Sequence, residues 1–385
     1  MLKVLFQNRP DAFDILGGDT IQMMKTREQL IKLGIEVNVC LDDEPDVSQY
    51  DLIHIFNIQT AEYGLKQLRN AKRYGKPVVV STIYWDLRYV NQREDVVRFH
   101  RSRLIRALAN KNWEISYRLL QIKRLLTVYN VFRDYRLRKK NKKKAYEMLK
   151  ESDLLLPNSY AETEIMAFQF DAPWIRSKAI VVPNGIEVRE YESINKADVE
   201  NLVAQLPEKY VLEVGRFEPF KGQWRLIKAL MDTPEIPLVF IGYAGNKIYW
   251  QECKNLGEKR GNTWFIEAVP HDKIDLFYRK AKVHVLPSLR ESPGLVTLEA
   301  AVNGANCVVS IHGPVMEYFG CDVWYCDPLD IGSIKKAVLQ AWDSPCTTNL
   351  KQKVVENFTW IKAAKKTIEA YKHVLSDSRK VSTYE

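Results

Sequence analysis

Two glutamates lie eight positions apart on either side of a Ser-Pro-Gly turn, in the stretch LRESPGLVTLEAAVNG at residues 289–304. The apolar run KVHVLPS before the turn is typical of a buried strand, and the run after it has helical spacing. The unit therefore predicts a strand, a loop and a helix, with Glu291 in the loop and Glu299 on the helix. Carboxylates in these two places can accept hydrogen bonds from a ligand bound at the turn.

The start of that helix is a candidate anion site. Ser292 suits the N-cap, Pro293 suits the first helical position, and Gly304 suits the left-handed residue after the helix end. Early helix amides lack intrahelical partners and carry partial positive charge, so they favour a bound phosphate. Here these amides are expected to be those of Gly294, Leu295 and Val296. Taken alone, the stretch is more typical of a capped core helix with two solvated glutamates.

Apolar, β-rich runs alternate with helical segments along both halves of the chain. This alternation predicts parallel sheets covered by helices, and two such series predict two Rossmann-like, doubly wound α/β domains. We place the first domain at residues 1–187, with a basic helical insertion at about 98–150, and the second at 188–357. A closing helix is expected within residues 358–385.

Several loops at the predicted strand ends carry groups that bind anions, and ligands of parallel sheets bind at these ends. EVGRFEPFKG contains Arg216 and Lys221, FIGYAG contains Gly242, and RESPG leads to the helix at Gly294. If these strands are neighbours, the two cations and the helix start form a cradle for a diphosphate. In the first half, a glycine pair follows the first strand just before a helix.

The second half resembles the donor-binding domain of retaining GT-B glycosyltransferases of family 4, the bacterial polysaccharide type. The matching stretches are VVPNGIE, VGRFEPFKG, FIGYAG, VLPSLRESPGLVTLEAAVNG and NFTWIKAAKKTIEAYKHVL, which span about 200 residues. The spaced glutamates are a specific signature when VGR and KG precede them by about seventy residues, as they do here. The resemblance implies two domains that face a central cleft and a last helix that crosses back to the first domain.

The resemblance also implies a role for each matching residue. Arg216 and Lys221 would hold the donor diphosphate, Glu299 would bind the nucleotide ribose, and Glu291 would face the sugar hydroxyls and the reacting carbon. The family's pocket histidine is absent from IYWDL, so Asp86 is a candidate replacement. A lone His54 in LIHIF is more often structural. The other donor-binding positions would be Gly17, Gly18, Gly242, Ser292, Gly294, Leu295 and Val296.

The implied reaction is transfer of a hexose, with retention, from a nucleotide sugar to a polysaccharide or a lipid-linked oligosaccharide. A UDP-sugar is the expected donor, with UDP-glucose as one candidate. No metal or other cofactor is expected, because Arg216, Lys221 and the helix start supply the positive charge. A sugar-nucleotide epimerase of the same fold, or a non-catalytic membrane or nucleic-acid binding protein with a nucleotide pocket, remain alternatives. A nicotinamide-dependent oxidoreductase is disfavoured because GGDTIQ is not G-x-G-x-x-G.

The charge of the chain is unevenly distributed. Its net charge is +9, yet residues 98–150 contain 17 Lys and Arg against three acidic residues, so the remainder is net acidic. The apolar positions Ile115, Leu119, Ile122 and Leu126 have helical spacing among these cations. The segment suits an anionic membrane surface as well as it suits a solvated insertion, whereas no nucleic-acid motif accompanies it.

The sequence also indicates where the protein works. The N-terminus turns polar after six residues, as expected of a first strand rather than a signal peptide, and no apolar run is long enough to span a membrane. The six cysteines are scattered and form no zinc or disulfide pattern. We therefore expect a cytoplasmic enzyme that can dock at the inner face of the membrane.

Overall fold

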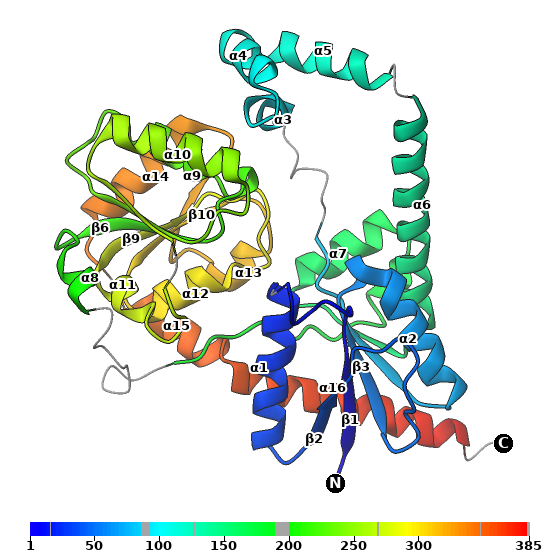
Figure 1. Ribbon diagram of the computed structural model, residues 1–385. Coiled ribbons are helices and arrows are strands. Elements are labelled where there is room, and N and C mark those ends of the chain that lie inside the picture. The colour runs from blue at the N-terminus through cyan, green and yellow to red at the C-terminus, as the bar shows by residue number, and fades with distance from the viewer. Residues whose placement is uncertain are drawn as a thin grey trace. The chain divides into compact units, whose positions relative to one another are not determined.

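The computed structural model describes residues 1–15, 17–85, 93–125, 128–188, 200–267, 269–346 and 348–382. The chain divides into two compact units, and each contains a wholly parallel sheet with helices packed on it (Figure 1). Unit 1 comprises Met1–Asp86, Val128–Gly185 and Phe358–Glu385, and unit 2 comprises Leu87–Thr127 and Ile186–Asn357. The prediction of two parallel-sheet α/β domains is confirmed.

The sheet of unit 1 has the strand order β2-β1-β3-β4-β5. Its strands are almost continuous apolar runs because helices cover both faces of a parallel sheet. The strands are β1 (Lys3–Gln7), β2 (Glu36–Val39), β3 (Leu52–Phe56), β4 (Val78–Ser81) and β5 (Leu154–Leu156). The helices are α1 (Gly18–Lys32), α2 (Ala61–Arg73), α6 (Val128–Glu151), α7 (Tyr160–Gln169) and α16 (Trp360–Ser382).

The last helix, α16, belongs to unit 1 and packs against α1, so the expected return of this helix to the first domain is confirmed. A buried polar contact links it to the sheet. His54, in the middle of β3, has Nδ1 2.6 Å from the hydroxyl of Tyr371 on α16 and Nε2 2.9 Å from Oγ of Ser81. Burial lowers the pKa of His54 to about 3, which keeps the ring neutral. His54 is therefore structural.

The sheet of unit 2 has the strand order β11-β10-β9-β6-β7-β8, which places β6 between β9 and β7. The carboxyl ends of β6, β7 and β9 therefore share one edge. The strands are β6 (Tyr210–Val214), β7 (Leu238–Ile241), β8 (Thr263–Ile266), β9 (Ala281–Leu286), β10 (Asn306–Ser310) and β11 (Trp324–Cys326). The helices are α8 (Glu200–Ala204), α9 (Gln223–Ala229), α10 (Lys247–Arg260), α11 (Asp275–Lys280), α12 (Leu295–Val302), α13 (Val315–Phe319), α14 (Ile331–Asp343) and α15 (Asn349–Asn357).

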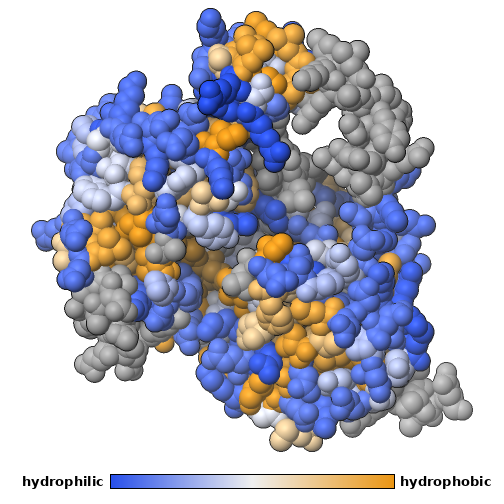
Figure 2. Space-filling model, viewed as in Figure 1, coloured by the Kyte–Doolittle hydropathy of each residue, from blue (hydrophilic) through white to orange (hydrophobic). Residues whose placement is uncertain are grey.

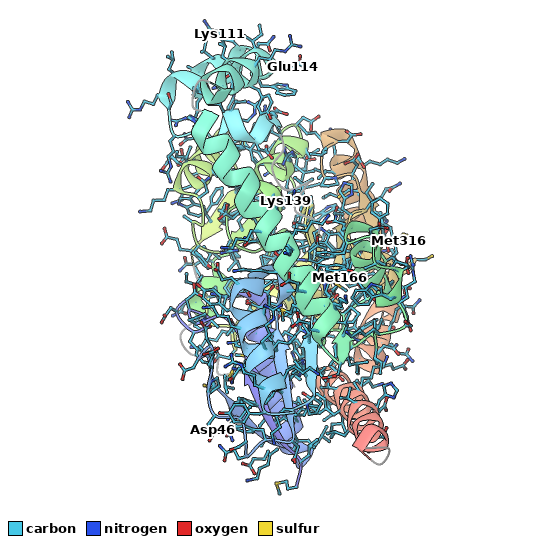
Figure 3. The ribbon with its side chains drawn as sticks, turned by 90° about the vertical axis from the view of Figure 1, so that its right-hand side faces the viewer. Asp46, Lys111, Glu114, Lys139, Met166 and Met316 are labelled. Atoms are coloured by element: carbon cyan, nitrogen blue, oxygen red, sulfur yellow. The ribbon has the colours of Figure 1, made fainter. Side chains whose placement is uncertain are left out.

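The basic segment is divided between the units, whereas the sequence suggested an insertion of the first domain alone. Helices α3 (Arg93–Arg98), α4 (Arg103–Lys111) and α5 (Trp113–Leu125) belong to unit 2, and α6 belongs to unit 1. Long-range contacts explain the division. Asp95 on α3 accepts hydrogen bonds of 2.7 Å from Arg225 on α9. Arg69 on α2 holds α6 through Glu147 and Glu151 (Figure 3, with Lys139 marking α6).

Candidate functional site

The loop after β6 and the loop after β7 come together at the carboxyl edge of the second sheet. The amide of Phe217 donates to the carbonyl of Tyr243 at 3.0 Å, which ties the two loops to each other. Gly242 makes this approach possible, because its φ is +154° and an added Cβ would lie 2.0 Å from the carbonyl oxygen of Gly215. Gly242 thus shapes the floor of the site through its missing side chain.

Lys221 and Glu291 form an ion pair at this edge. Nζ of Lys221 donates to Oε1 of Glu291 at 2.5 Å, and the two side chains are only 17% and 11% exposed. Lys221 ends a short 3-10 turn, Pro219–Lys221, after β6, and Glu291 lies in the loop after β9. The sequence analysis assigned Lys221 to the diphosphate and Glu291 to the sugar, and the structure brings the two side chains into direct contact.

A third cation, Arg290, belongs to the same cluster. Burial lowers the pKa of Arg290, the positive charge of Arg216 lowers it further, and the Glu291 carboxylate opposes both. Arg290 thus interacts electrostatically with Arg216 and with Glu291, its neighbour in the sequence. The sequence reasoning named Arg216 but missed Arg290, although a basic residue in the RESPG loop was a signal for it.

The helix start differs from its prediction in one respect. Helix α12 begins at Leu295, its N-cap is Gly294 with a φ of +93°, and the Thr297 amide donates to the Gly294 carbonyl at 3.0 Å. Ser292 is therefore not the N-cap and Pro293 is not the first helical residue, because the chain enters the helix through the left-handed glycine. The amides of Leu295 and Val296 lie in the first helical turn, as expected of an anion site.

The end of α12 agrees with the prediction. Gly304 has a φ of +91°, and its amide donates to the carbonyl of Ala301 at 3.1 Å. The amide of Ala305 donates to the carbonyl of Ala300 at 3.2 Å. These two hydrogen bonds form a Schellman motif, for which a left-handed glycine is the usual residue.

Glu299, on α12, is held by two side chains that the sequence reasoning did not identify. Its Oε2 accepts from the hydroxyl of Tyr278 at 3.2 Å, and its Oε1 lies 3.0 Å from Nε2 of His271. Burial raises the pKa of Tyr278 well above its ordinary value, and Glu299 raises it further, so the hydroxyl remains a donor. His271 follows β8, so the strand-end rule that located Arg216 could also have located it.

A buried carboxyl group lies inside the sheet next to this cluster. Glu213 on β6 is 1% exposed, and within the described part of the chain neither carboxylate oxygen has a hydrogen-bond partner. Burial raises its pKa well above the ordinary value, Lys221 lowers it and Glu291 raises it. Burial thus favours the neutral form of Glu213, which interacts electrostatically with two members of the cluster. Its signal in the sequence is a charged residue inside an otherwise apolar strand.

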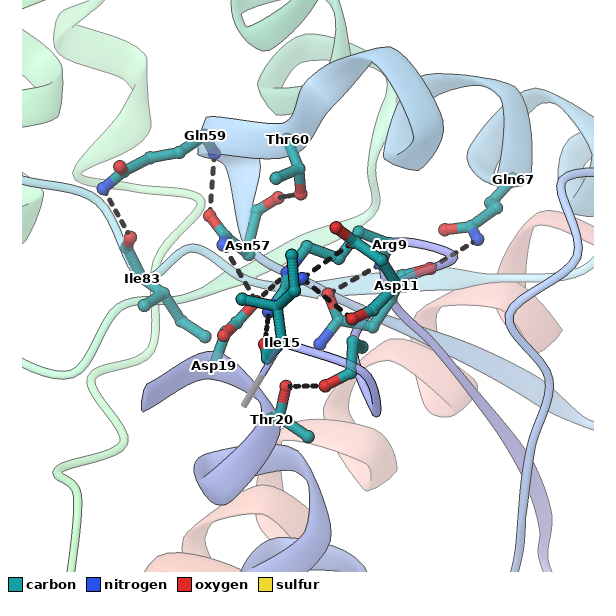
Figure 4. Close-up of polar contacts among 12 residues, drawn as sticks. Arg9, Asp11, Ile15, Asp19, Thr20, Asn57, Gln59, Thr60, Gln67 and Ile83 are labelled. Atoms are coloured by element: carbon teal, nitrogen blue, oxygen red, sulfur yellow. Dashed lines mark hydrogen bonds and ion pairs between the residues drawn. The ribbon is translucent and has the colours of Figure 1, made fainter. Parts of the chain in front are cut away.

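The glycine pair of unit 1 lies at the start of α1, after a loop that Arg9 holds in place (Figure 4). Arg9 donates to Asp19 at 3.1 Å, to Asp11 at 2.7 Å and to the carbonyl of Ile15. Burial lowers the pKa of Arg9, but its hydrogen bonds to Asp19 and Asp11 outweigh this effect and raise it. The sequence reasoning missed this Arg9 network, which fixes the loop that precedes the helix.

Gly17 and Gly18 are not equivalent in this loop. Gly17 is the N-cap of α1, and an added Cβ would lie 2.5 Å from Oδ1 of Asp19. Gly18 is the first residue of α1, and no atom lies within 4 Å of its added Cβ. Both belong to unit 1, whereas the cation cluster belongs to unit 2. Asp86, the candidate replacement for the family histidine, lies outside the described residues.

Residues 195–374 match the family model described as glycosyl transferases group 1. An uncharacterized glycosyltransferase from Methanocaldococcus jannaschii is 32% identical over 53% of this chain and 55% of its own length. The O-antigen chain mannosyltransferase B from Escherichia coli is 30% identical over 42% of this chain and 45% of its own. A D-inositol 3-phosphate glycosyltransferase from Corynebacterium glutamicum is 25% identical over 77% of this chain and 76% of its own length. The chain spans about half the length of the first two relatives.

Solved structures agree on the fold. Sucrose-phosphate synthase from Thermosynechococcus elongatus has a TM-score of 0.69 at 16% identity and covers 98% of this chain and 100% of its own. HepE from Anabaena in complex with UDP and glucose has a TM-score of 0.65 at 17% identity and covers 97% and 100%. The fold is GT-B.

Two further properties of the described residues bear on function. No group of three or more His, Cys, Asp or Glu side chains in the described ranges is arranged to hold a metal ion. Within the same ranges, no helix is both long and apolar enough to cross a bilayer.

Proposed function

We propose that the protein is a retaining glycosyltransferase that moves a hexose from a nucleotide sugar to a saccharide acceptor. The observation that carries the proposal is the cluster of unit 2, where Lys221 contacts Glu291 beside Arg216, Arg290 and the start of α12. Positive charge at a helix start suits a diphosphate. Glu299, which Tyr278 and His271 hold in place, is proposed to accept a further hydrogen bond from a ribose hydroxyl.

In this proposal the protein contributes charge and position rather than a covalent intermediate. Arg216, Lys221 and Arg290 stabilise the negative charge that develops on the leaving diphosphate as the glycosidic bond breaks. The ammonium of Lys221 has three N–H donors, so it can bind a phosphate oxygen while it remains bonded to Glu291. Glu291 then orients the sugar hydroxyls, and the acceptor hydroxyl attacks from the face that the diphosphate leaves.

We propose a UDP-sugar as the donor and a polysaccharide or lipid-linked oligosaccharide as the acceptor. HepE, which shares the fold, has been solved in complex with UDP-glucose, and a curated relative is named for an O-antigen chain. Gly17 and Gly18 are proposed to bind the diphosphate from unit 1. The reaction should need no metal, because the cations of unit 2 supply the charge; loss of turnover in EDTA, restored by Mg²⁺ or Mn²⁺, would contradict this.

Calorimetric titration of the purified protein with UDP, GDP, ADP and NAD, all in EDTA, tests the donor site. We expect one nucleoside diphosphate to bind tightly and Glu299→Ala to weaken it about tenfold or more, as expected for a charge-assisted hydrogen bond. Glu258→Ala, which removes an exposed carboxylate of α10, is the matched control and should bind like the parent. Preference for NAD, or binding that ignores Glu299, would refute the proposal.

We further propose that helices α4 and α5 dock the enzyme on an anionic membrane surface at the cytoplasmic face. Leu104 and Leu108 on α4, and Ile115 and Leu119 on α5, are exposed, with Leu104 at 69% and Leu119 at 51%. Figure 2 shows apolar side chains gathered over α4, next to hydrophilic ones. Such a surface inserts apolar groups at the headgroup level while cations attract anionic lipid.

Sedimentation with phosphatidylglycerol vesicles tests the membrane proposal. The variant Leu104→Ser/Ile115→Ser should lose most of its binding, because two exposed apolar anchors are removed without a change in charge. The control Val355→Ser changes an exposed apolar residue on α15 and should leave binding intact. No sedimentation of the parent protein at low salt would refute membrane docking and would leave the donor site untouched.

A further inference from the structure

A basic pocket of about 480 Å³ lies within unit 2, between α3 and α4 on one side and α9 and α10 on the other. The donor cluster consists of Arg216, Lys221, Arg290, Glu291 and the start of α12. None of these is among the described residues that line the pocket. Among the described lining residues, the charged side chains are Arg98, Arg103, Arg106, Lys228 and Lys259 as cations and Glu252 as a carboxylate.

The pocket is a fixed feature because buried contacts hold its two walls together. Nη2 of Arg225 on α9 donates to both carboxylate oxygens of Asp95 on α3 at 2.7 Å, and both side chains are buried. Phe99, in the core of unit 2, packs edge-on against Trp224 and Tyr249, with ring centroids 6.0 and 4.7 Å apart. An opening of the walls would expose this aromatic contact and an ion pair, so the pocket is preformed.

The cations of the pocket are held in place by neighbouring groups. Arg98 donates to Glu94 at 3.0 Å and to Asn110 at 3.3 Å, and its guanidinium lies 4.8 Å from the centre of the Trp224 ring. Lys228 lies 4.9 Å from the same ring. One nitrogen of Arg106 donates to the carbonyl of His100 at 2.7 Å. A guanidinium has five N–H donors, so these bonds orient the groups and leave donors for a ligand.

We infer that this pocket binds a phosphate group, carried by a phosphorylated saccharide or by a lipid headgroup. The five cations around this cavity repel each other, and the lining carboxylate Glu252, with Glu94 bonded to Arg98, offsets only part of their charge. The oxygens of a phosphate can accept paired hydrogen bonds from the planar guanidinium groups of Arg98 and Arg106. The site is independent of the donor cluster and adds an anion site to unit 2.

Equilibrium binding of inorganic pyrophosphate to the full chain tests the inference. The parent should show two classes of site, one in the donor cluster and one in the pocket. Arg103→Ala/Lys259→Ala removes two exposed cations of the pocket and should weaken one class at least about tenfold. The control Lys111→Ala/Lys254→Ala removes the same charge from the same two helices, but outside the pocket. It should change the Kd of each class of site less than about threefold. Lys221→Met should weaken only the other class.

The results separate this inference from the donor proposal. If the Arg103 and Lys259 variant binds pyrophosphate like the charge control, the pocket inference is overturned, whatever Lys221→Met does. If Lys221→Met retains both classes of site while Arg103→Ala/Lys259→Ala loses one, the donor cluster is misplaced and the pocket inference is supported. Glucose 1-phosphate and phosphatidic acid vesicles then identify the source: pocket-dependent binding of the former indicates a soluble phosphorylated saccharide, and of the latter a lipid headgroup.

Discussion

The contact between Lys221 and Glu291 makes a prediction that distinguishes their two roles. The Lys221 ammonium donates to the Glu291 carboxylate at 2.5 Å in a mostly buried pair. A nucleoside diphosphate bound as proposed would contact Lys221 next to a fixed negative charge. Lys221→Met should weaken the binding of UDP, whereas Glu291→Gln should strengthen it, although both variants should lose sugar transfer.

The magnitudes follow from the charges involved. A charge-assisted hydrogen bond contributes about 1.5 to 3 kcal/mol, so Lys221→Met should raise the Kd of UDP about 10- to 150-fold. Glu291→Gln keeps a hydrogen-bond acceptor for Lys221 and removes one negative charge beside the phosphates. At the effective dielectric of a partly exposed site this repulsion is on the order of 1 kcal/mol, which corresponds to about fivefold tighter binding.

Calorimetric titration of UDP in EDTA measures both effects, and hydrolysis or transfer from UDP-glucose measures the loss of turnover. Glu258→Gln, with the same charge change on an exposed residue of α10, is the control for long-range electrostatics. The double variant Lys221→Met/Glu291→Gln completes a double-mutant cycle, which isolates the coupling within the pair. If Glu291→Gln weakens UDP as much as Lys221→Met does, the carboxylate supports the nucleotide site and the assigned roles are wrong.

Three further predictions concern other parts of unit 2. Glu299→Gln should weaken UDP about tenfold but leave pyrophosphate binding unchanged, because it is proposed to contact the ribose; calorimetry with both ligands compares them. Glu213 has a raised pKa in the folded state, so its contribution to stability is lost as pH rises above its ordinary value of 4.5. The melting temperature of Glu213→Gln relative to the parent should therefore rise between pH 5 and pH 8, as calorimetric scans can show. Gly242→Ala places a Cβ 2.0 Å from a carbonyl oxygen and should lower the free energy of unfolding, measured by urea titration, by at least about 2 kcal/mol. The control Gly18→Ala, with open space around its Cβ, should lower it by less than about 0.5 kcal/mol.

The fold was predictable because its signals are local. Parallel strands covered on both faces are short continuous apolar runs, and LIHIF and KVHVL stand out as such from the polar segments around them. That the loops carrying the residues of the donor cluster lie at one edge of the sheet was predictable for a related reason. Once the strands are placed in one sheet, their carboxyl ends share an edge, so Arg216, Lys221 and the glutamate loop had to meet there.

The contacts within the cluster could not be predicted, because they depend on side-chain positions across loops far apart in sequence. Lys221 and Glu291 are 70 residues apart, and nothing in either loop says that they pair. The division of the basic segment between the units depends on the contact between Asp95 and Arg225, which lie 130 residues apart in the sequence. The N-cap was misassigned because the preferences of Ser for the N-cap and of Pro for the first helical position do not take account of Gly294. The chain enters α12 through this glycine in a left-handed conformation.

The buried Glu213 links the apolar pattern of β6 to the charge of the cluster, because its protonation state affects the net charge around Lys221. Lys221 interacts electrostatically with two glutamates, Glu291 in the loop and Glu213 inside the sheet. If both were ionised, they would more than offset the ammonium and leave the diphosphate to Arg216 and Arg290. Burial raises the pKa of Glu213 and so favours its neutral form, which leaves less negative charge to oppose the phosphate contact proposed for Lys221. A residue that breaks the apolar pattern of a strand thus remains compatible with an anion site, on the condition that the sheet keeps water away from it.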